Sequence, residues 1–110
     1  MLNKVTEITD NNFQQEVMDD SGVVLIDFYA DWCSPCKMLS QTMDQLSGEF
    51  NGRAKICKAN VESSSGIVSK LGINGVPSLV MFKSGELVDN HVGLRSKQDL
   101  INDLTKACNG

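Results

Sequence analysis

Two cysteines three positions apart are the residues of this chain whose chemistry is easiest to foresee. Cys33 and Cys36 follow a run of apolar residues and precede a stretch with helical spacing. Side chains at positions i and i+3 of a helix share one face, so the two thiols lie within reach of a disulfide. Unpaired backbone N–H groups at a helix start favour the thiolate, which is the reactive form. The spacing predicts a dithiol that opens and closes, because a crosslink over so short a loop stabilises a fold little.

The position of each cysteine predicts a separate role. Cys33, at the N-cap, is expected to be the more exposed thiol and the nucleophile that attacks a disulfide of another protein. Cys36, one turn further along and more buried, is expected to attack the resulting mixed disulfide and release the product. The alternative is part of a zinc site, but zinc takes four ligands and the spare candidates, Cys57, His91 and Cys108, are scattered. The sequence favours redox chemistry with no bound metal and no cofactor.

Asp27 lies inside a run of apolar residues that is expected to form a buried strand. Burial disfavours the charged carboxylate and raises its pKa, which would suit a general acid or base acting on Cys36, through water. The alternative is a structural ion pair with Lys58 on the next predicted strand. Both interpretations can hold together, and the expected catalytic residues are Cys33, Cys36, Asp27 and Lys58.

The elements that must position these residues follow from hydrophobic periodicity and turn signals. Five strands are predicted, over residues 5–9, 23–30, 53–61, 78–82 and 86–92. Four helices are predicted: from an Asp10 cap to the break at Ser21-Gly22, from the cysteines to Phe50, from Ser64 or Ser65 to Leu71, and after a Ser96 cap. The order βαβαβαββα predicts an α/β fold in which helices flank a central, mixed, five-stranded sheet.

Length and composition limit the possible functions. The 110 residues suit a single domain, 1–110, and a net charge of −4 with scattered basic residues argues against nucleic-acid binding. The N-terminus has no apolar segment typical of a secretory signal, and no apolar run approaches the ~20 residues of a membrane span. Four cysteines without such a signal predict a reducing compartment, the cytoplasm. The protein is expected to be a monomer without a membrane partner.

The chain resembles the thioredoxin family along essentially its whole length. The segment Trp32-Cys33-Ser34-Pro35-Cys36 carries the resemblance together with residues 24–28, 76–78, 82–85 and 92–93. The resemblance implies the thioredoxin fold and a general protein-disulfide reductase. It also implies disulfide-containing proteins as substrates and recharging by a thioredoxin reductase. Ser34 replaces the glycine usual in the family, which bears on the redox potential.

The resemblance also implies where substrates bind. It places Pro35 and Pro77 at the site, with a cis Val76-Pro77 bond facing the cysteines. Trp32, adjacent to Cys33, suggests an apolar shelf beside the thiol, the alternative being a core side chain. Gly75 and Gly93 are interpreted as points where a bound peptide approaches the backbone, the alternative being turn geometry. The expected substrate-binding residues are Trp32, Ser34, Pro35, Ile73, Gly75, Val76, Pro77 and Gly93.

Other interpretations of the chain and of its remaining polar groups stay open. A binding or assembly subunit with the same fold and an incidental dithiol is the alternative function. Cys57 and Cys108 are expected to be small buried hydrophobes, with oxidation of Cys108 as a minor hypothesis. His91 is expected to be an exposed strand residue.

Overall fold

A computed structural model of the chain describes residues 4–110. Its strands form one mixed sheet in the order β1-β3-β2-β4-β5, in which β2 lies at the centre. β2 is parallel to β3 and antiparallel to β4, and this confirms the predicted α/β architecture. The strands are β1 (Thr6–Glu7), β2 (Val23–Tyr29), β3 (Ala54–Asn60), β4 (Ser78–Lys83) and β5 (Glu86–Val92).

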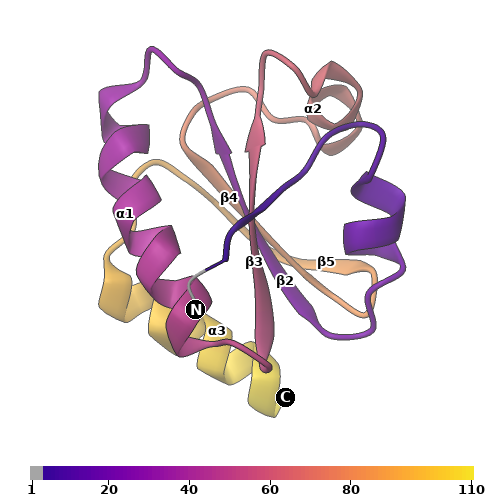
Figure 1. The fold of residues 1–110 in the computed structure, drawn as a ribbon, viewed down its shortest axis with the longest axis vertical. Helices are drawn as coiled ribbons and strands as arrows, with labels where there is room; N and C mark the ends of the chain where they lie inside the picture. The colour runs from indigo at the N-terminus through magenta and orange to yellow at the C-terminus, as the bar shows by residue number, and fades with distance from the viewer. Residues whose placement is uncertain (1–3) are drawn as a thin grey trace.

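Helices cover both faces of the sheet (Figure 1). They are η1 (Gln14–Met18), α1 (Ser34–Glu49), α2 (Ser65–Leu71) and α3 (Lys97–Asn109). One core cluster joins α1 and α3 to the sheet, and a second joins η1 and α2 to the opposite face. The predicted cap at Ser96 is confirmed, because its hydroxyl accepts a hydrogen bond from the Asp99 backbone N–H at 3.1 Å. The predicted first helix is only the five-residue π-helix η1.

Asp10 does not cap the helix that follows it, which corrects the sequence prediction. Its two carboxylate oxygens accept hydrogen bonds from the backbone N–H groups of Gly66 and Ile67, at 3.1 and 2.9 Å. Asp10 therefore caps α2. The Ser64 side chain, at the N-cap position of α2, makes no capping bond and instead donates to the Ile8 carbonyl oxygen. Proximity between segments more than fifty residues apart decides this cap.

We expect an Asp10→Ala substitution to lower the free energy of unfolding by about 1 kcal/mol, because the first turn of α2 loses its side-chain acceptors. Urea unfolding measures the change. Asn11→Ala is the matched control, since the Asn11 side chain is exposed and only its backbone N–H is bonded, to Thr9. Equal losses in the two variants would contradict the cap.

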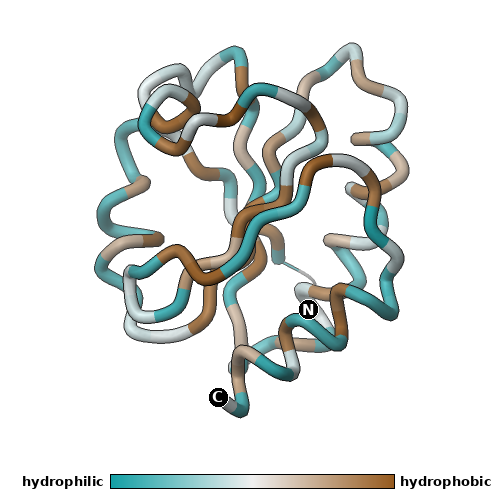
Figure 2. The backbone as a smooth tube through the Cα atoms, turned by 180° about the vertical axis from the view of Figure 1, so that it is seen from behind, coloured by the Kyte–Doolittle hydropathy of each residue, from teal (hydrophilic) through white to brown (hydrophobic). Residues whose placement is uncertain are grey.

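The side chains of β2 alternate between the two faces of the sheet, and this decides which of them lie on the side of the cysteines. Val24, Ile26 and Phe28 contribute to the core beneath η1 and α2, whereas Val23 and Leu25 contribute to the core beneath α1 and α3. Because side chains alternate along a strand, Asp27 points to the α1 side of the sheet. Figure 2 shows the hydrophobic stretches along the strands that cross the centre of the molecule. Asp27 is thus a buried ionisable residue in a strand whose other buried residues are apolar.

Candidate active site

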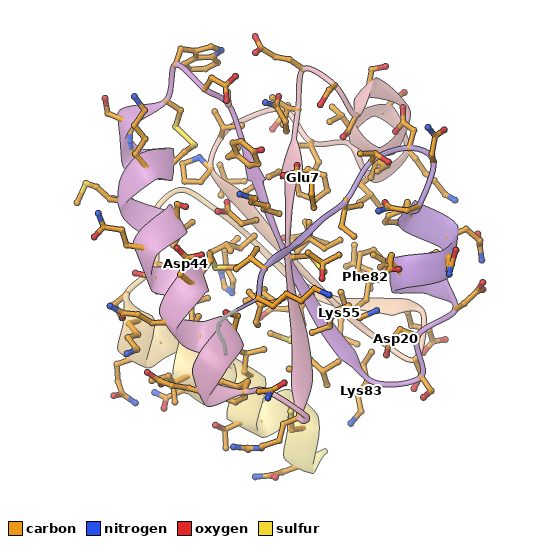
Figure 3. All side chains as sticks on the ribbon, in the orientation of Figure 1. Glu7, Asp20, Asp44, Lys55, Phe82 and Lys83 are labelled. Atoms are coloured by element: carbon orange, nitrogen blue, oxygen red, sulfur yellow. A yellow bond between two sulfur atoms is a disulfide. The ribbon has the colours of Figure 1, made fainter. Side chains whose placement is uncertain are left out.

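Cys33 and Cys36 form a disulfide at the beginning of α1, with their Cα atoms 5.3 Å apart (Figure 3). The pair lies just beyond the carboxyl end of the central strand β2. Exposed fractions are 4% for Cys33 and 3% for Cys36, so both residues are buried in the oxidised protein and differ little in exposure. The bond draws both sulfurs into one small cluster with Ala30, against which Val76 packs.

The predicted N-cap position of Cys33 is confirmed. Its backbone is extended, with φ −95° and ψ 109°, and its Sγ accepts a hydrogen bond from the Cys36 backbone N–H at 3.2 Å. Pro35, in the first turn, has no N–H to offer, so the Cys36 N–H is the donor that reaches this sulfur. A hydrogen bond of this kind is stronger to a thiolate than to a thiol and favours the charged form. The helix start therefore supports an anionic sulfur at Cys33.

Asp27 is buried beneath the disulfide, with an exposed fraction of 2%. Its Oδ1 has no hydrogen-bond partner among residues 4–110. Burial raises the pKa of this carboxyl to about 7, and the positive charge of Lys58 opposes the rise. A carboxyl with this pKa exists in both protonation states near neutral pH.

A cavity of about 160 Å³ connects Asp27 with Cys36. Tyr29, Lys37 and Lys58 also line it. Water occupies roughly 30 Å³ per molecule in the liquid, so this volume accommodates a short chain of waters. The cavity gives a proton a path between the Asp27 carboxyl and the Cys36 sulfur.

Lys58 is the register partner of Asp27 across β2 and β3. It nevertheless forms no ion pair with Asp27 within the described part of the chain. Its Nζ lies 4.0 Å from Glu7 Oε1 and 5.9 Å from the centre of the Tyr29 ring. Lys58 thus lies on the strand next to Asp27, as expected, but the alternative of a direct Asp27–Lys58 ion pair is not what the structure shows.

Trp32 has an exposed fraction of 70%, so the alternative of a core side chain is wrong. A hollow of about 300 Å³ lies beside it and is lined in part by Ile73, Gly75 and Val76. The Val76-Pro77 bond is cis, as the resemblance implied. The structure thus brings several of the expected substrate-binding residues to one edge of the disulfide, and Ser34 and Pro35 are exposed between the two cysteines.

The two candidate glycines differ. Gly93 has a φ of +97°, which favours glycine, and its N–H donates to the Pro77 carbonyl oxygen at 2.8 Å. A Cβ at Gly93 would meet no atom within 4 Å, so the space beside it is open. Gly75 has no positive φ, and a Cβ there would lie 3.4 Å from a methyl group of Val92. The backbone conformation therefore accounts for glycine at position 93 and not at position 75.

Comparison with known proteins identifies the family. The family model described as Thioredoxin matches residues 4–106. The chain belongs to the thioredoxin family. It is 39% identical over 100 residues to a thioredoxin of Rickettsia felis, covering 91% of this chain and 95% of the relative. Identity to a thioredoxin of Pseudomonas aeruginosa is 36% over 100 residues, covering 91% and 93% of the two chains. Identity to a thioredoxin of Staphylococcus haemolyticus is 38% over 102 residues, covering 93% and 96%.

Family membership and the Cys33–Cys36 geometry together give the function. This thioredoxin-family chain is a protein-disulfide oxidoreductase that uses a reversible dithiol, acts on thiol and disulfide groups of other proteins, and is recycled by reduction. The comparisons give no support to a binding or assembly subunit. No helix within residues 4–110 combines the length and apolar character needed to cross a membrane.

The remaining cysteines and the histidine lie away from the thioredoxin-type disulfide. Cys57 is buried in β3, as expected, and burial raises the pKa of its thiol to about 12. Cys108 is half-buried, and its Sγ donates to the Arg53 carbonyl oxygen at 3.4 Å. His91 is half-buried rather than exposed, because its ring packs against carboxylates 3.1 and 3.8 Å away. Across positions 4–110, the one grouping of possible metal ligands includes His91 but neither active-site cysteine.

Tyr29 and Glu7 belong to the surroundings of the site and were missed by sequence reasoning. The Tyr29 hydroxyl donates to the two carboxylate oxygens of Glu7 at 3.2 and 3.3 Å. Burial and the Glu7 carboxylate raise the pKa of Tyr29 to about 12. A signal was present for Tyr29, which lies two positions after Asp27 and therefore shares its face of the strand. Nothing in the sequence pointed to Glu7, which lies on a two-residue strand.

Proposed function

We propose that Cys33 is the attacking nucleophile of this thioredoxin-type site, that Cys36 is the resolving thiol, and that Asp27 accepts the proton of Cys36 during resolution. The observation that carries the proposal is the Cys33 sulfur at the N-cap of α1, where it accepts the Cys36 N–H. In the reduced protein this donor and the helix start would stabilise a thiolate. Cys36 has no comparable donor among the described residues and lines the Asp27 cavity instead.

The first step forms a mixed disulfide. The Cys33 thiolate attacks one sulfur of a substrate disulfide, a Cys33–substrate S–S bond forms, and the substrate bond breaks. The second substrate sulfur leaves as a thiolate and takes a proton from solvent.

The second step regenerates the disulfide seen in the structure. The Asp27 carboxylate accepts the Cys36 thiol proton through water in the cavity. The Cys36 thiolate then attacks the Cys33 sulfur, the Cys33–substrate bond breaks, and the substrate sulfur leaves as a thiolate. This thiolate takes a proton from solvent, so the released substrate carries two thiols, and Asp27 returns its proton to solvent. The substrate gains two electrons, and the Cys33–Cys36 pair loses two. An external reductant must return them before the next cycle.

The substrate-binding surface is proposed to be the exposed apolar shelf around the disulfide. Trp32 and the hollow lined by Ile73, Gly75 and Val76 support it, as does the open space beside Gly93. We include Pro77, which follows Val76 in the chain, and Ser34 and Pro35, which are exposed at the helix start. Apolar contact and backbone hydrogen bonds read little side-chain identity, which suits a reductase with many protein substrates.

The physiological setting is part of the same proposal. We infer that the chain acts as one domain over residues 1–110, as a monomer, in the cytoplasm, and that a thioredoxin reductase recharges it. Two free cysteines, Cys57 and Cys108, favour a reducing compartment.

We expect a Cys36→Ser protein to accumulate a mixed disulfide with a disulfide-containing protein such as insulin. Cys33 can still attack, but no second thiol is in place to displace the substrate. Non-reducing electrophoresis and mass spectrometry of the crosslinked peptide measure the trap, and dithiothreitol should release it. The double variant Cys33→Ser/Cys36→Ser is the control and should trap nothing. A crosslink through Cys57 or Cys108, or no crosslink at all, would contradict the assigned roles.

A further inference from the structure

Lys58 lies between two carboxylates, and this arrangement bears on the acid–base step. The register pairs Lys58 on β3 with Asp27 on β2 and, on its other side, with Glu7 on β1. Residues paired in register project from the same face of a sheet, so the three side chains form one row across three strands. Tyr29, two positions after Asp27, shares this face.

The contacts along this row are unequal. Glu7 receives the Tyr29 hydroxyl at both carboxylate oxygens and lies 4.0 Å from the Lys58 ammonium. The Lys58 ammonium also lies 5.9 Å from the centre of the Tyr29 ring. On the other side of Lys58, Asp27 Oδ1 has no hydrogen-bond partner in the part of the chain that the structure describes. The Lys58 side chain is 40% exposed, and within residues 4–110 its ammonium pairs with Glu7 and not with Asp27.

We propose that Glu7, anchored by the Tyr29 hydroxyl, is a positioning residue that holds the Lys58 ammonium away from Asp27 and so sets how readily Asp27 exchanges a proton with Cys36. The effect on the reaction rests on the acid–base role proposed above for Asp27. The Tyr29 hydroxyl remains a donor at neutral pH because the pKa of Tyr29 is raised to about 12. The anchor therefore persists over the pH range in which Asp27 titrates.

Among the charged groups around Asp27, Lys58 is the one whose movement would change the pKa of Asp27 most. The titratable residues that line the cavity with Asp27 are Tyr29 from β2, Asp31 after it, Cys36 and Lys37 from α1, and Lys58 from β3. Lys37 and Asp31 are exposed, so water screens both charges. Lys58 is the cation that opposes the burial-driven rise in the pKa of Asp27. If it moved closer, this opposition would strengthen and the pKa of Asp27 would fall.

The test is the titration of the Asp27 carboxyl carbon, followed by NMR in the oxidised protein. For Glu7→Gln, which keeps the shape and removes the charge, we expect the midpoint to fall by about one pH unit, the size produced by bringing a cation ~2 Å closer at an intermediate dielectric constant. For Tyr29→Phe, which removes the anchor without changing any charge, we expect a fall in the same direction but smaller. Unchanged midpoints in both variants would overturn the proposal.

Two controls separate positioning from simple loss of a negative charge. Asp44→Asn removes the same charge from an exposed position on α1, well separated from Glu7 on β1 (Figure 3). It should leave the Asp27 midpoint within ~0.2 units. In a Lys58→Met background, Glu7→Gln should produce little further shift, because the group that it holds is gone. A shift of undiminished size in that background would overturn the proposal in favour of a direct field effect.

A kinetic readout distinguishes this inference from the proposed function. The pH profile for resolution of the mixed disulfide should move to lower pH in Glu7→Gln, in parallel with the Asp27 titration. If the titration moves and the kinetic profile does not, the acid–base role of Asp27 fails, whereas the placement of Lys58 by Glu7 is supported.

Discussion

A Cys33→Ser protein is expected to lose its insulin-reductase activity by about three orders of magnitude or more, leaving only the background rate of the dithiothreitol used as reductant. A serine hydroxyl at this position stays protonated at neutral pH and is a poor nucleophile toward sulfur. The hydrogen bond from the Cys36 N–H can still form to the serine oxygen, so α1 should remain capped. Turbidity of the precipitating insulin B chain measures the loss.

The control for this variant is Cys108→Ala. Cys108 lies half-buried on α3, where its Sγ donates a hydrogen bond to the Arg53 carbonyl oxygen. Its replacement should leave the activity near that of the parent protein. Full activity of Cys33→Ser, or an equal loss of activity in Cys108→Ala, would contradict the assignment of Cys33 as the nucleophile.

An Asp27→Asn protein is expected to have a free energy of unfolding higher than that of the parent by up to about 4 kcal/mol at pH 8. At pH 4 the two proteins should differ little in stability. The folded-state pKa of Asp27 is raised to about 7 by burial, whereas an unfolded chain has a value near ~3.9. Between these values the folded state holds more protons, so stability falls as the pH rises from about 4 to about 7. Above pH ~8 the full cost in stability of the buried Asp27 carboxylate is present, and below pH ~4 this cost is absent because the carboxyl is protonated.

Urea unfolding of both proteins at several pH values measures this dependence. Asparagine keeps the size of the side chain and removes the charge, so the difference reports the buried ionisation rather than a cavity. A gain that is the same at pH 4 and pH 8 would contradict a raised pKa and point to a packing effect.

The same variant should be a slower reductase. Without a carboxylate at the base of the cavity, the proton of Cys36 must leave by another path. We expect resolution of the mixed disulfide to slow by about 10²-fold at neutral pH, at the low end of what a positioned base contributes. If the variant is more stable and less active, the Asp27 carboxyl serves the reaction although it lowers the stability of the fold.

Much of the site could be predicted because the information is local. The alternating and continuous apolar patterns gave the central strand and the hairpin to within one or two residues. The junction between strand and helix placed Cys33 at an N-cap and Pro35 in the first turn, as the structure confirms. Asp27 stood out because a carboxylate in an apolar run is rare.

The residues that were missed or misassigned depend on contacts between distant segments. Asp10 caps a helix more than fifty residues away. The burial of both Cys33 and Cys36 in the oxidised protein involves Val61 and Val76, which come from distant segments and pack against their cluster. Glu7 enters the site because β1 pairs with β3 in one particular register. Such register is a property of the folded sheet, and a single chain does not display it in any local pattern.

The sequence by itself determined the dithiol, its position at the start of a helix, the buried carboxylate and the order of the elements. These features depend on residue type and on spacings within one element or across one junction. The tertiary structure alone decided that Lys58 lies between Asp27 and Glu7 and that the cavity joins Asp27 to Cys36. Both follow from how strands and helices pack together, since the strength of a charge interaction depends on the distance and dielectric surroundings that packing sets.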